Sequence, residues 1–142
     1  MKVENILQAK GVDVFSVRPE DKIAQAVSVL NDKNIGAVIV RDGAQNVVGI
    51  LSERDIVRKM GAHGGDALSM SVSDCMTPDP ITCGPEATVD EVMGLMTQRR
   101  IRHMPIVDGN GLVGVISIGD VVKRKIDEAE QEAQALKEYI AG

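Results

Sequence analysis

The chain has 142 residues, 44% of them hydrophobic and 26% charged, with a formal net charge of −5 at pH 7. This length and balance fit one compact module and do not fit two independent domains. The acidic chain has one Tyr, one Phe and no Trp. It therefore lacks the basic face and stacking aromatics of nucleic-acid binders, and we expect no nucleic-acid partner. We also expect a cytoplasmic protein with no membrane partner, since no apolar run has the length of a signal-peptide core or a membrane span.

The first part of the chain predicts a leading helix followed by strand, helix, strand, strand and helix. Apolar residues spaced for one helical face alternate with continuous apolar runs of strand length, and Pro19 and the Asp42-Gly43 turn separate them. The predicted elements are helix 3–10, strand 12–17, helix 19–30, strand 35–40, strand 47–51 and helix 52–60. We assign residues 1–61 to a first repeat and the Gly-rich residues 62–71 to a linker.

The second part of the chain predicts the same order of elements, so residues 72–125 form a second repeat. The predicted elements are helix 72–76, strand 81–83, helix 85–98, strand 101–107, strand 112–117 and a helix from residue 119. A C-terminal helix over residues 126–142 continues the last of these. Its apolar residues keep a helical spacing that predicts packing against a partner surface. They are Ile126, Ala129, Ala133, Leu136 and Ile140.

The two parts of the chain share sequence as well as pattern. The segment VVGILSERDIV at 47–57 returns as LVGVISIGDVV at 112–122, and self-similarity at a fixed distance indicates a repeated structural unit. We predict an α/β (α+β) fold in which two pseudo-symmetric β-α-β-β-α repeats pack as one module, with the C-terminal helix added. Because neither copy is large enough to bury much core alone, the copies should pack together and leave clefts between them.

The pattern that carries chemistry in each copy is Ser-x-x-Asp where a strand runs into a helix, at Ser52 and Asp55 and again at Ser117 and Asp120. The N–H groups and positive end of a helix start attract phosphate, and a carboxylate accepts hydrogen bonds from ribose hydroxyls. The same pattern is also an ordinary helix cap. Its duplication favours ligand binding, and the two roles are compatible.

A cluster of cations precedes the central strand of the second repeat, at Arg99, Arg100 and Arg102. We expect Arg99 and Arg100 to be solvated cations at a helix C-terminus, where they are favourable without a ligand. Arg102 lies closer to the strand, and Arg54 lies inside the first Ser-x-x-Asp. These two are the candidates for neutralising a phosphate group.

Two histidines and two cysteines raise the alternative of a metal or redox protein. His63, His103, Cys75 and Cys83 match no metal-ligand spacing, so we predict reduced thiols and no metal site. The sequence also holds no Ser-His-Asp order, phosphate-binding glycine loop or carboxylate pair that would predict catalysis. We therefore do not expect an enzyme.

The segments GILSERDIVRKM and RRIRHMPIVDGNGLVGVISIGDVVK resemble a tandem pair of cystathionine β-synthase (CBS) domains, the Bateman module. The resemblance covers residues 1–125 and is to the small stand-alone bacterial pairs. It implies a regulatory or sensor module that binds an adenosine ligand such as AMP, ADP, ATP, NAD(H) or S-adenosylmethionine, without a catalytic cofactor. It also implies a homodimer that acts on an unknown protein target.

The resemblance further implies two clefts, each built from both repeats. The first joins Ile50, Ser52, Arg54, Asp55, Thr77, Asp79, Arg102, His103 and Met104. The second joins Val115, Ser117, Asp120, Asp13, Gly36 and Ala37. Because Gly36 stands where the second repeat has Arg102, the clefts are inequivalent, and the first, with more cations, is expected to bind more tightly. The alternative is a structural or protein-interaction dimer whose clefts stay empty.

Overall fold

A computed structural model describes residues 1–11 and 13–141. Its elements are α1 (Val3–Lys10), β1 (Ser16–Val17), α2 (Ile23–Lys33), β2 (Ala37–Arg41), β3 (Val47–Ser52), α3 (Glu53–His63), the 3₁₀ helix η1 (Gly64–Ser69), α4 (Val72–Cys75), β4 (Thr77–Pro78), α5 (Val89–Arg99), β5 (His103–Asp108), β6 (Gly111–Ser117) and α6 (Ile118–Ala141). Val12 of the predicted strand 12–17 and Gly142 of the predicted C-terminal helix lie outside the described residues. The predicted α/β fold class is confirmed.

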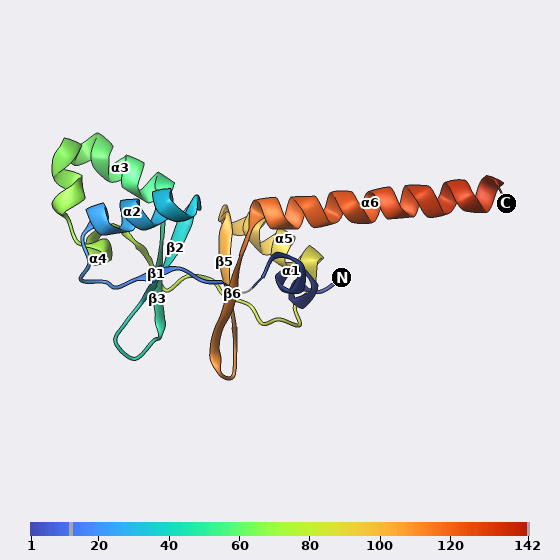
Figure 1. The fold of residues 1–142 in the computed structure, drawn as a ribbon, viewed down its shortest axis with the longest axis horizontal. Helices are drawn as coiled ribbons and strands as arrows, with labels where there is room; N and C mark the ends of the chain where they lie inside the picture. The colour runs from blue at the N-terminus through green and yellow to red at the C-terminus, as the bar shows by residue number, and fades with distance from the viewer. Residues whose placement is uncertain (12, 142) are drawn as a thin grey trace.

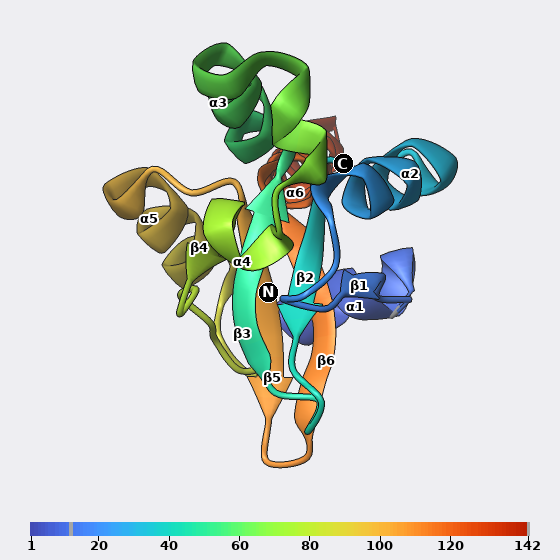
Figure 2. The ribbon, with the colours of Figure 1, turned by 90° about the vertical axis from the view of Figure 1, so that its left-hand side faces the viewer.

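Two sheets lie next to each other at the centre of the molecule (Figure 1). The first has the order β1-β2-β3-β4, with β1 parallel to β2 and the other neighbours antiparallel, and the second is the antiparallel pair β5-β6. Helices α2, α3 and α4 lie beyond the first sheet, and α1 and α5 lie beyond the second. Turned by 90°, the molecule shows β2 and β3 in front of β5 and β6 (Figure 2). Each sheet therefore has helices on its outer face and the other sheet on its inner face.

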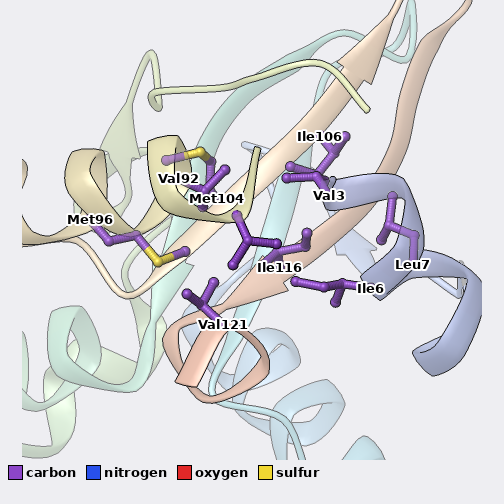
Figure 3. Close-up of a cluster of buried hydrophobic side chains, with 10 residues drawn as sticks. Val3, Ile6, Leu7, Val92, Met96, Met104, Ile106, Ile116 and Val121 are labelled. Carbon is purple, nitrogen blue, oxygen red and sulfur yellow. The ribbon is translucent and has the colours of Figure 1, made fainter. Parts of the chain in front are cut away.

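Each repeat has its own buried core, and the two leading helices are exchanged between these cores. Helix α1 packs Val3, Ile6 and Leu7 with Ile106 and Ile116 in the core of the second repeat (Figure 3). Helix α4, which precedes the second repeat in the sequence, packs in the core of the first. This differs from the assignment of residues 1–61 to one repeat. Apolar spacing predicts the helix but not its partner, because both cores offer the same kind of aliphatic surface.

The longer helix at the start of each repeat begins later than predicted. Helix α2 begins at Ile23 because the chain first makes a turn, in which Oδ2 of Asp21 accepts the N–H of Arg18 at 2.9 Å. Helix α5 begins after Thr88, whose hydroxyl accepts the N–H of Glu91 at 3.1 Å. The prolines at the predicted starts therefore belong to these turns and not to the helices.

Two predicted segments take a different form in the structure. The predicted linker 62–71 is largely helical, since α3 extends to His63 and η1 follows it. Ala67 is fully buried there and anchors the segment, which a Gly-rich composition does not indicate. The predicted strand 81–83 is reduced to a single bridge between Cys83 and Ile106. The strand that joins the sheet is β4, which pairs with β3.

Helix α6 merges the last helix of the second repeat with the predicted C-terminal helix. Val121 in its first turns is fully buried, whereas Ile126 is 53%, Leu136 59% and Ile140 76% exposed. The C-terminal half of α6 projects away from the rest of the molecule (Figure 1). Despite this length, none of the helices within residues 1–11 and 13–141 is apolar enough to cross a membrane.

Candidate functional site

The first Ser-x-x-Asp caps helix α3 at the point where β3 ends. Oγ of Ser52 accepts the N–H of Asp55 at 3.3 Å, and Oδ2 of Asp55 accepts the N–H and the hydroxyl of Ser52 at 2.9 Å and 3.1 Å. The capping hypothesis is therefore correct for this pair. Since these bonds use Oδ2 of the carboxylate, capping leaves Oδ1 for a ligand, and both roles remain compatible.

A cavity of about 300 Å³, here called cleft one, opens over this helix start. That volume lies at the lower end of the range for small-molecule sites. Cleft one is lined by Gly36, Ile50, Ser52, Glu53, Arg54, Asp55, Arg58, Thr77, Arg100, Ile101, Arg102 and His103. Residues from both repeats line it, as the resemblance implied.

Cleft one concentrates positive charge on an acidic chain. Four of the eight arginines in the sequence line it, namely Arg54, Arg58, Arg100 and Arg102, against two acidic residues, Glu53 and Asp55. The whole chain carries a net charge of −5. Guanidinium groups that converge on a helix N-terminus form a site suited to phosphate.

His103 forms part of the wall of cleft one. It is half-buried, and a Cβ built on Gly36 would lie 3.6 Å from its Nε2. Burial lowers the pKa of His103 from its ordinary 6.5, so the imidazole is neutral at pH 7. A neutral imidazole offers one donor and one acceptor to a ligand.

Seven of the nine residues predicted for the first cleft line cleft one. Met104 does not, because β5 alternates its faces and turns this side chain into the core, where it is fully buried. Asp79 does not line cleft one either. It lies just after β4, where its backbone N–H donates to the carbonyl of Val48. Arg100, expected to be a solvated helix end, lines the cleft, since the left-handed backbone that ends α5 (φ 55°) turns it from the helix axis.

Sequence reasoning missed three further lining residues, Glu53, Arg58 and Ile101. A signal was present for Arg58, because it follows Arg54 by four residues and so shares its face of α3.

The second Ser-x-x-Asp has the same local geometry as the first. The N–H of Asp120 donates to Oγ of Ser117 at 3.2 Å, and Oδ2 of Asp120 accepts the N–H of Ser117 at 2.9 Å. The two helix starts differ in the side chain that contacts the aspartate, which at Asp120 is Lys10. Nζ of Lys10 lies 2.7 Å from Oδ2 of Asp120 and donates to the carbonyl of Val115 at 3.0 Å.

The ion pair at the second helix start is only partly exposed, with 38% of the Lys10 side chain and 23% of the Asp120 side chain accessible. Burial alone would raise the pKa of Asp120, but the hydrogen bonds from Lys10 and Ser117 outweigh it and hold the pKa below its usual value.

The residues predicted for the second cleft lie in different places in the structure. Gly36 lines cleft one instead, Ala37 pairs with Ser52 in the first sheet, and Asp13 is exposed in the segment before β1. A smaller cavity of about 170 Å³ lies beside Asp120. It is lined by Ile6, Ala9, Lys10, Asp120, Lys123, Arg124 and Asp127.

The metal and redox alternative finds no geometric support in the part of the chain that the structure describes. No three His, Cys, Asp or Glu side chains come together there as metal ligands would. Cys75 is buried, Cys83 is half-buried, and both are free thiols. Burial raises the pKa of both, which keeps them in the less reactive protonated form.

The fold defines a protein made of two related repeats with a cleft lined by both. A family model described as "CBS domain" matches residues 8–62 and again residues 72–127. The chain belongs to the CBS domain family and is a tandem pair of its domains.

Relatives of known sequence and structure agree with this assignment. The CBS domain-containing protein CBSX3, mitochondrial, of Arabidopsis thaliana is 41% identical over 127 residues, which are 87% of this chain and 62% of that protein. YhcV of Bacillus subtilis is 35% identical over 76% of each chain. The crystal structure of the CBS-domain protein ATU1752 from Agrobacterium tumefaciens superposes with a TM-score of 0.84 at 41% identity, covering 87% of this chain and 92% of that one.

Two more distant matches are to an enzyme and to a CBS pair solved with ligands. Inosine-5'-monophosphate dehydrogenase of Methanocaldococcus jannaschii is 31% identical over 114 residues, but these make up only 22% of that enzyme. The CBS pair of protein MJ0100, solved in complex with 5-methylthioadenosine and S-adenosyl-L-methionine, has a TM-score of 0.78 at 23% identity. At that identity the likeness shows the fold alone.

Proposed function

We propose that the chain is a non-catalytic regulatory module that binds one adenosine-containing ligand in cleft one. The observation that carries this proposal is that four arginines line cleft one, together with the capped start of α3, in an otherwise acidic chain. A ligand with negative charge and hydroxyl groups complements these residues. Because both repeats line the cleft, bound ligand would fix how they sit against each other, and a partner protein could sense that change.

Each part of an adenosine ligand has a matching group in cleft one. Phosphate would lie against Arg102, Arg54 and the N–H groups that begin α3. Ribose hydroxyls would donate to Asp55. Adenine would lie near Ile50 and Thr77, which also line the cleft. The binding of adenosine ligands by the CBS pair of MJ0100 supports this choice of ligand class.

Calorimetric titration of the full chain with AMP, ADP, ATP, NADH and S-adenosylmethionine tests the proposal, with GMP and GTP as matched controls. We expect at least one adenosine ligand to bind once per chain and to raise the melting temperature, because a ligand that binds only the folded state stabilises it. Absence of binding by all five would favour the alternative, a structural dimer with empty clefts.

We also propose a homodimer in which two α6 helices pair in parallel. The exposed apolar positions of α6 keep a heptad spacing, from Val122 through Ile126, Ala129, Ala133 and Leu136 to Ile140. In a parallel pair, Glu132 of one helix faces Lys137 of the other. In an antiparallel pair with the same apolar layers matched, Glu132 would face Glu132. Charge complementarity thus supports a second copy as the partner and a parallel orientation.

Leu136→Glu is expected to weaken the dimer at least tenfold, because it places a charge inside the apolar layer. Gln131→Glu adds the same charge on the opposite face of α6 and serves as the matched control. Sedimentation equilibrium measures both dissociation constants. If Leu136→Glu pairs as well as the control, the dimer does not form through α6.

A further inference from the structure

We propose that Lys10 decides which of the two related sites takes a ligand. Its ammonium group closes the second cleft, which is the cavity beside Asp120 at the start of α6. The proposal deepens the proposed function, since it concerns the same class of ligand. It makes the chain a one-site module although the sequence repeats the binding pattern twice.

The starts of α3 and α6 have the same capping geometry. The N–H of Ser52 lies 2.9 Å from Oδ2 of Asp55, and the N–H of Ser117 lies 2.9 Å from Oδ2 of Asp120. The chain is also held in the same way at each start, since the N–H after each serine donates to a carbonyl just before the central strand of the same repeat. Glu53 donates to Gly36 at 3.0 Å, and Ile118 donates to Arg102 at 2.8 Å. A difference in ligand binding between the two sites must therefore come from the side chains that surround each helix start.

Lys10 occupies the two acceptors that a ligand would need at the start of α6, a carboxylate and a carbonyl. Its ammonium bonds the carboxylate of Asp120 and the carbonyl of Val115 together. In cleft one the repeat counterparts of these residues, Asp55 and Ile50, line the open cavity. A ribose hydroxyl or an amino group would have to displace a charge-assisted bond of 2.7 Å to reach Asp120.

The two exchanged helices differ in length. Helix α4 ends at Cys75, the backbone is extended at Met76, and Pro78 disfavours helical backbone at Thr77, so the chain continues as β4. Thr77 then lines cleft one. Helix α1 carries no proline at the equivalent place, continues through Ala9 to Lys10 and ends at Gly11. This extra turn of helix places Lys10 against Asp120 at the second cleft.

Without Lys10, the second cleft would still carry positive charge. Lys123 and Arg124 line the cavity beside Asp120. A phosphate-bearing ligand would therefore still meet two cations there, next to the N-terminus of α6.

Lys10→Met removes the ammonium while keeping a long flexible side chain. Calorimetry with the adenosine ligand that binds most tightly to the unaltered chain is expected to give one ligand per chain before the change and two after it. Lys22→Met, which alters an exposed lysine before α2, is the control and should leave one. Circular dichroism on all three proteins verifies that each is folded.

The outcomes separate this proposal from the proposed function. One ligand in the unaltered chain and two in Lys10→Met supports the role of Lys10. One ligand in both, or two in both, overturns it while leaving the binding function intact. No ligand in any of the three proteins overturns the proposed function itself.

Discussion

Asp55→Ala is expected to weaken binding of the adenosine ligand at least tenfold while leaving the chain folded. Loss of charge-assisted hydrogen bonds to ribose costs about 1.5 to 3 kcal/mol, which is roughly tenfold or more in affinity. Loss of the cap on α3 costs about 1 kcal/mol, which is small against the typical stability of a domain, about 5 to 15 kcal/mol. Calorimetric titration and denaturant unfolding of the same sample measure the two effects separately.

Asp120→Ala is the matched control for this prediction. It removes a cap with the same geometry from α6 and also breaks the ion pair with Lys10. Because that carboxylate lies outside cleft one, its loss should leave the affinity of cleft one unchanged. Equal affinity in Asp55→Ala and in the unaltered chain would mean that Ser52 and Asp55 serve only as a cap.

The sequence predicted those parts of the fold that depend on local pattern. Apolar spacing gives the order of helices and strands in each repeat, and Ser52 and Asp55 cap a helix where a strand ends. The start of α2 was missed because the turn between Arg18 and Asp21 resembles a helix start in composition. Local pattern cannot separate the two, since both favour Pro followed by acidic residues.

The exchange of leading helices could not be predicted from one sequence. The apolar faces of α1 and α4 have the same spacing, so the sequence does not indicate which of the two cores each helix joins. Which core each helix joins depends on chain path and tertiary packing. The consequence reaches the site, because the exchange is what brings Lys10 from the start of the chain to Asp120 in the second repeat.

The lining of cleft one was predicted correctly for residues within a motif. It was predicted wrongly where the backbone directs a side chain into the core or into the cleft. The resemblance placed Met104 in the cleft, but strand alternation buries it. Arg100 enters the cleft because the backbone after α5 adopts the left-handed region, a conformation uncommon for a residue other than glycine. The sequence motifs alone predict neither the burial of Met104 nor the direction of Arg100.

Arg102→Ala is expected to weaken binding of ATP and ADP more than binding of adenosine. Arg102 lines cleft one, whereas its repeat counterpart is Gly36, so only one repeat supplies a cation at this point. A ligand with more phosphate charge gains more from that guanidinium than a nucleoside does. Titration with all three ligands, at low and at high salt, measures the difference.

Raising the salt concentration should shrink the difference between ATP and adenosine, because the Arg102 side chain is exposed and its charge is screened. Arg99→Ala is the control, since this neighbouring arginine ends α5 and does not line the cleft. Equal losses for all three ligands in Arg102→Ala would show that the side chain shapes the cavity without contacting phosphate. The phosphate role would then belong to Arg54 and the N-terminus of α3, which Arg54→Ala would test in the same titration.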